Sequence, residues 1–432
     1  MRLAVAVALA GCFGKPAFSG KDGAVGDDAA IDMAIDTPLA CTPSKPSAAG
    51  LVVDTTPADT RVMFLDGSLL GFRNVLTRYP MPDRLIVGGQ NLVAAPEGCA
   101  FEDAVGIAVY PIFNIGSQTL AGAPTHGLDA DMVGPAFTQL RTQWTIQLPN
   151  PCSPTPTQAA GNTSWGFFPD GKVVRNDTIV PGDMAPVTPG ASGCNCPTAG
   201  MGTTNALVTS YTTFEATQLS AVTRAGEPEQ SLLPSPGVLQ GALGACARGT
   251  AQGKVAVYWD RPDGMDPVPR PTRLRRVTNG ANSNHDIVAF VYDIFATQPG
   301  VAIPQDASYG IRTHMMLNGG SLPCTDLLAN VEGFAGAQPL MIGPAGSLGM
   351  ISYTSGGVFD DNTPYTGPIR IQGTLPSGFA VRLRFPGFTA VATDRAADRV
   401  VWQRHTDGSF IVFFKDGIDG TTAITMTPEC RP

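Results

Sequence analysis

Short apolar runs, separated by polar and turn-forming residues, recur along the chain from Leu51 to its end. Many of these runs alternate apolar with polar side chains, which is the pattern of a β-strand buried on one face. The pattern predicts strands in these segments: Leu140–Leu148, Lys254–Trp259, Ile287–Phe295, Gly310–Leu317, Ile369–Gly373, Ala380–Phe385 and Ala423–Thr427.

Turn signals join several of the runs. Asp-Gly pairs accept the positive φ angles of a tight hairpin turn, and three such pairs lie beside apolar runs. We therefore expect hairpins at Asp66-Gly67, Asp170-Gly171 and Asp407-Gly408. Two other segments predict short helices: Thr325–Glu332, with Thr325 as its N-cap, and Gln218–Ala225.

This pattern lacks the alternating helices of a parallel sheet. It predicts an all-β protein of antiparallel β-sandwiches with few short helices. We expect residues 49–250 to form the first sandwich or half and residues 251–432 the second, because the Gly-rich stretch Ala245–Gly253 interrupts the pattern. Gly and Pro number 50 and 38 of the 432 residues. This share stays below the roughly 25–30% typical of disordered chains, so a folded body is expected.

The first residues are of a different kind. Residues 1–11 combine one arginine with an apolar run that is shorter than the ~20 residues of a membrane span, which predicts a secretory signal peptide. The ending Leu9-Ala10-Gly11-Cys12 resembles the lipobox of bacterial lipoproteins. The resemblance implies cleavage before Cys12 and lipid on that residue. Because Phe13 rather than Asp follows, it also implies an outer-membrane location, on either the periplasmic or the cell-surface side. An ordinary signal peptide with an incidental cysteine is the alternative.

Residues 12–48 are rich in Gly, Ala, Ser, Pro and Asp and contain little to bury. We expect a disordered tether that holds the folded body away from the membrane. The membrane is therefore an expected partner through the lipid anchor. The net charge of −8 argues against nucleic acid as a partner.

The nine cysteines fit an oxidising compartment. With Cys12 set aside an even number remains, and the sequence leaves its disulfide pairing open. The disulfide candidates are Cys41, Cys99, Cys152, Cys194, Cys196, Cys246, Cys324 and Cys430. Cys194 and Cys196 are too close to pair with each other, and a metal site is their alternative. No Cys or His at zinc-finger spacing accompanies them, so no metal is predicted.

The usual catalytic signatures are missing. The sequence has no Gly-x-Ser-x-Gly elbow, no His-Glu-x-x-His, no P-loop and no dinucleotide fingerprint. Clustered oxygen ligands occur at Asp360–Asn362 and Asp416–Gly420, where ordinary turn chemistry is favoured over a loop calcium. No cofactor is therefore predicted, and whether the protein is an enzyme stays open.

One polar strand face carries the candidate catalytic residues. Alternation places Arg312 and His314 on the same face of the expected strand 310–317. A histidine beside an arginine supports proton transfer next to a bound anion; a solvated outer face is the alternative. A polysaccharide lyase needs such a base and such a cation. Tyr309, His285 and Arg175 are further candidates if all five residues converge in one cleft.

A basic cluster is the candidate ligand-binding segment of this acidic chain. It consists of Arg270, Arg273, Arg275 and Arg276. Guanidinium groups bind carboxylates and phosphates, so an acidic glycan or lipopolysaccharide is the expected ligand. The alternative is an exposed edge strand that its charges protect against aggregation.

The four tryptophans, Trp144, Trp165, Trp259 and Trp402, all fall in strand-like runs, and we expect most of them in the core. The run Trp165–Asp177 loosely resembles hairpins of large β-sandwich carbohydrate-active proteins. The resemblance implies no catalytic residue.

Three functions follow as hypotheses. The first is a membrane-anchored exported lipoprotein with a binding or structural role at the cell envelope, directed at glycans. The second is a carbohydrate-active enzyme, lyase-like, that acts on an acidic polysaccharide. The third is an envelope-assembly scaffold without a small ligand. The missing catalytic signatures favour the first.

Overall fold

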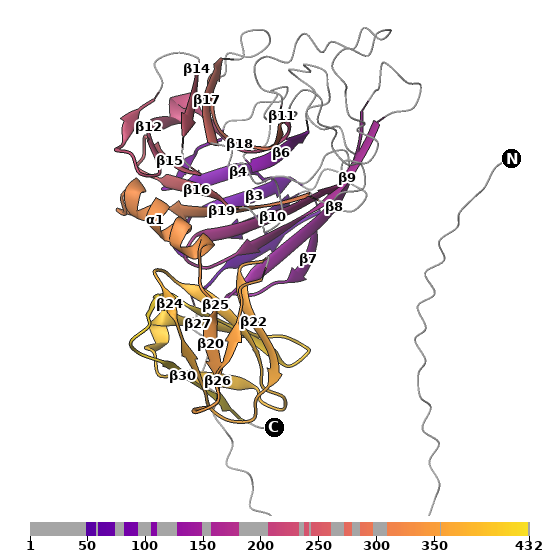
Figure 1. Cartoon of the computed structure of the whole chain (residues 1–432), viewed down its shortest axis with the longest axis vertical. Helices are drawn as coiled ribbons and strands as arrows, with labels where there is room; N and C mark the ends of the chain where they lie inside the picture. Colours follow the sequence, from indigo (N-terminus) through magenta and orange to yellow (C-terminus); the bar gives the residue numbers. More distant parts are fainter. Residues whose placement is uncertain are drawn as a thin grey trace, which may run out of the picture. The chain divides into compact units, whose positions relative to one another are not determined.

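The computed structural model describes most of the chain that follows the expected tether (Figure 1). The described residues are 49–57, 59–73, 82–93, 105–109, 128–148, 157–180, 206–232, 237–241, 243–260, 272–278, 286–296, 309–354 and 356–430. Residues 1–48 lie outside these ranges, so the signal peptide, the lipidated Cys12 and the tether stay predictions.

A nine-stranded antiparallel sheet is the largest element (Figure 1). Its order across the sheet is β13 (Gln230–Ser231), β12 (Leu219–Arg224), β15 (Gly244–Gly249), β16 (Lys254–Asp260), β19 (Tyr309–Asn318), β10 (Lys172–Val180), β9 (Thr157–Phe167), β8 (Thr138–Leu148) and β7 (Asp129–Met132). The expected division near residue 250 falls in the turn between β15 and β16, which pair directly within this sheet.

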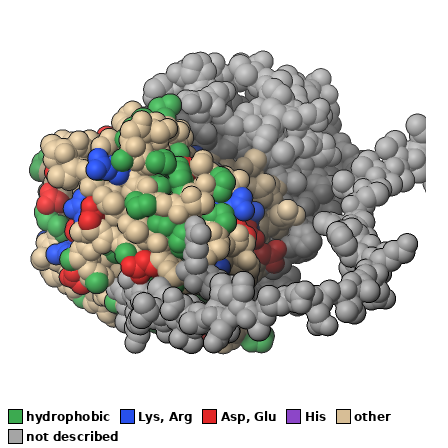
Figure 2. Space-filling view, turned by 90° about the horizontal axis from the view of Figure 1, so that it is seen from below, with side chains coloured by type: hydrophobic (Ala, Val, Ile, Leu, Met, Phe, Trp, Pro, Cys, Tyr) green, Lys and Arg blue, Asp and Glu red, His purple; other side chains and the backbone are tan. Residues whose placement is uncertain are grey.

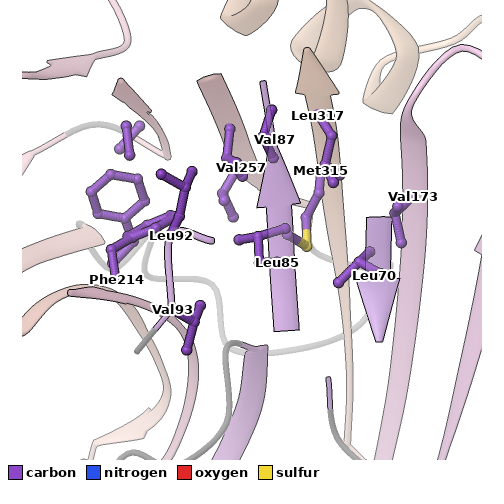
Figure 3. Close-up of a cluster of buried hydrophobic side chains, with 14 of the residues drawn as sticks. Leu70, Leu85, Val87, Leu92, Val93, Val173, Phe214, Val257, Met315 and Leu317 are labelled. Carbon is purple, nitrogen blue, oxygen red and sulfur yellow. The ribbon is translucent and has the colours of Figure 1, made fainter. Parts of the chain in front are cut away.

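Two five-stranded sheets share a core with the nine-stranded sheet. The first consists of β1 (Val52–Thr55), β2 (Asp59–Met63), β3 (Leu69–Arg73), β4 (Pro82–Val87) and β5 (Gln90–Asn91). The second runs in the order β14 (Gly237–Gly241), β17 (Thr272–Thr278), β18 (Asp286–Ala296), β11 (Ala206–Glu215) and β6 (Val105–Val109). Figure 3 shows Leu70 and Leu85 of the first sheet beside Met315 and Val173 of the nine-stranded sheet, with Phe214 of the second sheet in the same buried cluster.

The strands after residue 339 form a further body, which we call the C-terminal sandwich (Figure 1). One of its sheets has the order β21 (Gly349–Ile351), β20 (Leu340–Gly343), β23 (Ile369–Gln372), β30 (Ile424–Glu429) and β26 (Ala390–Thr393). The other has the order β22 (Val358–Pro364), β25 (Phe379–Arg384), β28 (Ser409–Phe414) and β27 (Val400–Arg404), and β24 (Thr374–Leu375) pairs with β29 (Ile418–Asp419). β22 and β25 are parallel, a departure from the expected antiparallel pattern.

Strand β28 explains how the C-terminal sandwich meets the rest of the chain. All of its residues are buried, because β28 is an inner strand whose two faces are both covered. Phe410, Val412 and Phe414 point into the core of the C-terminal sandwich. Ile411 and Phe413 join a second cluster instead, together with side chains from the other lobe of the chain that include Phe137, Phe168, Val174 and Phe334. One face of β28 therefore belongs to the core of the C-terminal sandwich, and the other face forms the contact with the rest of the chain.

One α-helix occurs among the described residues, α1 (Cys324–Ala335). It packs against β15, β16 and β19, and a disulfide between Cys246 and Cys324 ties its first residue to β15. Cys430 is also disulfide-bonded. The other expected disulfide cysteines lie outside the described residues.

The structure confirms the all-β fold class and most of the predicted elements. Each of the seven expected strands overlaps an observed one, namely β8, β16, β18, β19, β23, β25 and β30. The three Asp-Gly turns are hairpin turns with positive φ at Gly67, Gly171 and Gly408.

Both helix predictions need correction. The segment Gln218–Ala225 is strand β12, preceded by the short 3-10 turn Ala216–Gln218, because its apolar side chains pack into the sandwich core. The helix near residue 325 exists, but Pro323 is its N-cap and no side chain caps it. The Thr325 hydroxyl interacts with Asp326 instead.

Candidate binding groove

The nine-stranded sheet has one apolar and one polar face where β8, β9 and β10 run side by side. Successive side chains of a strand point to opposite faces. Leu140 of β8 and Trp165 of β9 therefore lie in the core, while Gln139 and Arg141 of β8 and Ser164 of β9 line an open groove on the other face. The described part of the chain thus presents a polar surface beside its largest core.

Backbone register assembles this polar surface from distant parts of the sequence. Arg141 pairs with Ser164, and Ser164 pairs with Asn176 of β10. Asn176 pairs in turn with Arg312 of β19, and Arg312 with Asp260 of β16. Because neighbouring strands lie about 4.8 Å apart, this row of polar residues extends for roughly 20 Å across the sheet.

The groove lies over β7 to β10 and has a volume of about 540 Å³. Amide, hydroxyl and carboxylate groups line it together with one guanidinium, and none of its lining side chains is a large hydrophobic one. The lining residues are Asp129, Asp131, Gln139, Arg141, Thr142, Gln143, Asn162, Thr163, Ser164 and Asn176. Arg141 Nε lies 2.5 Å from Asp131 Oδ2, which fixes the guanidinium at one side of the groove.

A charged cluster continues the polar row beyond the groove. Arg312 Nη1 lies 3.5 Å from Asp260 Oδ2, and the Arg312 guanidinium lies over the Tyr353 ring at 5.2 Å from its centroid. The Tyr353 hydroxyl is 3.3 Å from His314 Nδ1. His314 Nε2 faces Asp260 Oδ2 at 3.9 Å, beyond hydrogen-bond length.

Burial sets the protonation states of this cluster. His314 is buried and meets Phe334 of α1 edge-on, and desolvation lowers the pKa of its imidazole although Asp260 opposes the shift. Desolvation also raises the pKa of Tyr353, while Arg312 opposes that shift. At neutral pH the pair is therefore a phenol and a neutral imidazole. Tyr353 is the more exposed of the two side chains.

The structure places Arg175 apart from Arg312 and His314. Its side chain is fully buried on the core face of β10, where Nε lies 2.8 Å from Asp177 Oδ2 and the guanidinium lies over the Trp165 ring. Asp177 also accepts a hydrogen bond of 2.5 Å from Thr163 Oγ1. The sheet itself separates this pair from the polar face, so the five candidate residues do not all converge.

The other predicted residues are placed by their backbone alone or not at all. Tyr309 pairs with Ile179 and stands two positions from Ile311, in the opposite alternation to Arg312. His285 and Arg270 lie outside the described residues.

Three arginines of the basic cluster, Arg273, Arg275 and Arg276, belong to β17. This strand pairs with β14 on one side and β18 on the other. β17 is thus an inner strand, and the edge-strand interpretation of this cluster is wrong.

The two acidic segments make local hydrogen bonds, although Asp360–Asn362 lies within strand β22 and Asp419 within strand β29 rather than in turns. Asp361 accepts hydrogen bonds from the Thr363 amide at 2.9 Å and from the Tyr365 hydroxyl at 2.6 Å. Asp419 accepts the Thr421 amide at 2.9 Å. Within the described ranges no three His, Cys, Asp or Glu side chains are grouped to hold a metal ion.

Two tryptophans, Trp165 and Trp259, are fully buried, as expected for core residues. Trp402 is half-buried against the core of the C-terminal sandwich. None of the helices in the described part of the chain is long and apolar enough to cross a membrane.

Sequence reasoning identified none of the residues that line the groove. Gln139, Arg141 and Gln143 alternate with apolar or small residues in β8, and this period-2 pattern of polar side chains was the available signal. Asn176, Asp260 and Tyr353 carried no such signal, because only strand register and tertiary packing bring them to this face.

The comparisons with known proteins give a loose structural likeness. No protein-family model and no curated protein sequence matches the chain. Galactose 1-epimerase from Lactobacillus acidophilus NCFM is similar at 9% identity over 63% of this chain and 98% of that one, with a TM-score of 0.34. An alpha-mannosidase from Enterococcus faecalis V583 is similar at 9% identity over 89% and 42%, with a TM-score of 0.35.

Heparinase III is similar at 10% identity over 76% of this chain and 40% of that one, with a TM-score of 0.28. The chain spans less than half the length of the alpha-mannosidase and Heparinase III chains. These structural likenesses are loose, and they identify no family for the chain.

Proposed function

We propose that the protein is an exported, lipid-anchored, glycan-binding protein whose ligand lies in the groove over β7 to β10. The observation that carries the proposal is the groove itself. It has a volume of about 540 Å³, its lining is polar, and it lies on the open face of the nine-stranded sheet. Ligand sites in proteins are more often lined by apolar side chains. A surface this polar suits a ligand that is itself covered with hydroxyl groups.

The chemistry of the lining supports a sugar. Gln139, Gln143, Asn162 and Asn176 each carry both a donor and an acceptor within one planar group. Gln139 is buried, and its Oε1 atom lies 3.5 Å from Arg141 Nη2. Adjacent hydroxyls of a pyranose also donate and accept, so each amide can engage two of them at once. Ser164 and the carboxylates add acceptors that a hydroxyl group can satisfy.

Charge favours a neutral glycan over an acidic one in this groove. Its lining carries two carboxylates, Asp129 and Asp131, against the one guanidinium of Arg141. Figure 2 views the molecule from below, and on its described part the basic side chains stand singly among acidic, apolar and uncharged ones. An acidic glycan or lipopolysaccharide would instead use Arg312 and the β17 arginines, and it is the second arm of the test.

Binding by the full chain to neutral and acidic oligosaccharides, measured by calorimetry, tests the proposal. Asn176→Ala and Gln143→Ala should each weaken binding of the preferred neutral glycan about tenfold, since each removes a two-point contact worth roughly 1.4 kcal/mol. Gln338→Ala is the matched control, because Gln338 is exposed after α1 and far along the chain from the groove strands. Absence of binding across the panel would leave the envelope scaffold as the better hypothesis.

The anchor has a separate test. Cys12→Ser should move the protein from the membrane to the soluble fraction, because lipid on that residue is the proposed attachment. Membrane retention of this variant would contradict lipid anchoring and leave the groove proposal untouched.

A second candidate function is acid–base catalysis on an acidic polysaccharide, and the contact between Tyr353 and His314 favours it. In a β-elimination, Tyr353 would take the proton beside the uronate carboxylate while its own hydroxyl proton passes to His314 Nδ1, and Arg312 would neutralise the carboxylate. The glycosidic C–O bond would then break, and the departing oxygen would receive a proton back from this pair. Ultraviolet absorbance of unsaturated uronates, together with new reducing ends, would demonstrate it. Tyr353→Phe should then abolish both signals while binding persists. If no uronate polymer gives this absorbance, the hypothesis of lyase activity is wrong.

A further inference from the structure

One side chain of the C-terminal sandwich binds the turn that joins β7 and β8. Gln403 of β27 places its Oε1 atom 2.8 Å from the Ala136 amide nitrogen and 3.0 Å from the Phe137 amide nitrogen. Both amides belong to the turn between β7 and β8, and all three residues are buried. Gln403 thus satisfies two backbone donors that are shielded from water.

These two contacts fix which way the Gln403 amide points. Both backbone groups are donors, so the atom that they meet must be the carbonyl oxygen and cannot be the NH2 group. The NH2 group is then the atom that lies 3.1 Å from His405 Nε2. His405 Nε2 must accept this hydrogen bond, which requires the neutral imidazole with its proton on Nδ1.

The turn leaves Gln403 no room to rearrange in place. A Cβ atom at Gly134 would lie 2.3 Å from Gln403 Oε1 and 2.4 Å from its Cδ. The glycine is therefore what allows this close approach of side chain and turn. Any rotation of the amide that relieves a conflict at His405 breaks the contacts to Ala136 and Phe137.

We propose that His405 and Gln403 form a pH-sensitive latch that holds the C-terminal sandwich on the β7–β8 turn. Protonation of His405 converts Nε2 from an acceptor to a donor that faces the donor NH2 group of Gln403. The two donors repel, and the buried contacts to the turn are lost or weakened. The latch is closed when His405 is neutral and opens when it is charged.

Few other charges act on His405. Asp407 on the same hairpin favours the charged imidazole, and Arg382 of β25 opposes it. The segment 133–138 of the β7–β8 turn contains no titratable residue. Burial is the main influence and lowers the pKa of His405 below the ordinary value of 6.5. A depressed histidine pKa means that the latch is fully closed above pH 6.5 and is lost as the pH falls through the lower value.

The turn that the latch holds lies beside the groove. Asp131 and Gln139, which flank the turn on β7 and β8, both line the groove. Opening of the latch would therefore loosen one wall of the groove in an acidic environment. The latch itself does not depend on whether the groove binds a glycan.

Hydrogen exchange of the full chain tests the latch directly. After correction for the intrinsic effect of pH, amides of residues 136–138 should lose about tenfold protection between pH 7.5 and pH 5.5, since one pKa unit corresponds to a tenfold change. His405→Gln should keep an acceptor for the Gln403 NH2 group and abolish this pH dependence. Amides of β20, in the same sandwich, are the internal control and should not change.

Gln403→Glu should invert the dependence. Its carboxylate still accepts from both turn amides and now also from a protonated His405, so protection of residues 136–138 should rise as the pH falls. Equal pH dependence in wild type and His405→Gln would overturn the latch, and so would its absence in wild type. Circular dichroism at both pH values shows that each variant is folded, and His405→Gln alone decides the matter if Gln403→Glu does not fold.

Discussion

The nine-stranded sheet carries an arginine–aspartate pair on each of its faces, and the two pairs live in opposite environments. Arg175 and Asp177 on the core face have no exposed side-chain surface. Arg141 and Asp131 on the groove face keep 56% and 34% of theirs. The Nε-to-carboxylate distances are similar, 2.8 and 2.5 Å. The comparison teaches that each ion of the buried pair depends on its partner, whereas the exposed pair leaves a guanidinium available to a ligand.

Some hydrogen-bonding atoms of the buried Arg175–Asp177 pair have no partner among the described residues. Within the described ranges, Nη1 and Nη2 of Arg175 meet no hydrogen-bond acceptor, and the guanidinium rests on Trp165 instead. Desolvating two ions costs several kcal/mol each, which their attraction offsets only while both are present. The exposed pair bears no such cost, because water solvates whichever partner is left alone.

The largest effect should come from breaking the buried pair. Arg175→Met leaves Asp177 without its counter-charge in the core, and the free energy of unfolding should fall by about 3–5 kcal/mol. Urea denaturation followed by tryptophan fluorescence measures the change, with Trp165 close to the substitution. A loss of less than about 1 kcal/mol would show that the pair is not sealed from water.

Removing both buried charges should restore most of that loss. In Arg175→Met with Asp177→Leu neither ion is stranded, and an apolar pair of similar volume fits a core already built of Trp165 and Val173. The same denaturation experiment should place the double variant within about 1 kcal/mol of wild type. Additive destabilisation by the two substitutions would mean that packing and not charge dominates at this site.

The groove pair should show the reverse behaviour. Arg141→Met should change the free energy of unfolding by less than about 0.5 kcal/mol, because exposed ion pairs contribute little. The same change should weaken glycan binding about tenfold by removing a donor from the groove wall. Arg399→Met is the control, since Arg399 is similarly exposed and ion-paired in the C-terminal sandwich but lies outside the groove. Equal binding by Arg141→Met and wild type would move the ligand elsewhere.

A pH-dependent effect is expected at the covered end of the polar face, where His314 is buried. Burial lowers the pKa of His314, so its contribution to stability is fully present above pH 6.5 and is lost as the pH falls through the lower folded value. Stability should decline by at most about 1.4 kcal/mol for each pH unit in that window. His314→Gln should flatten this part of the profile in thermal unfolding measured from pH 7.5 to 5. An unchanged profile would place the acid sensitivity at other groups.

Sequence patterns predicted the fold better than the groove, for a physical reason. Strand alternation and Asp-Gly turns are local, and they identified β8, β19 and the hairpin between β9 and β10. The segment Leu219–Arg224 misled because its short mixture of apolar and polar residues suits a helix or a strand, and packing decides between them.

Predicting the polar face required strand register and tertiary contacts, which the alternation of polar and apolar residues does not contain. Arg312 and His314 were correctly placed on one face, since they are two residues apart in β19. The sequence could not show on which face of the sheet Arg175 lies. Val173 and Val174 before it are both apolar, so strand alternation does not show which residues of β10 point into the core. Their partners Asp260 and Tyr353 come from β16 and from the chain after α1, and only register and tertiary contact select them.

The double burial of β28 bears on how the molecule can be divided. Cutting the chain between α1 and β20 would uncover Phe137, Phe168 and Phe334 on one fragment and Ile411 and Phe413 on the other. Both fragments would then expose apolar surface to water and would aggregate rather than fold separately. The C-terminal sandwich is therefore not a detachable module. Transferring it into another protein would also require transferring the aromatic side chains that cover β28, namely Phe137, Phe168 and Phe334.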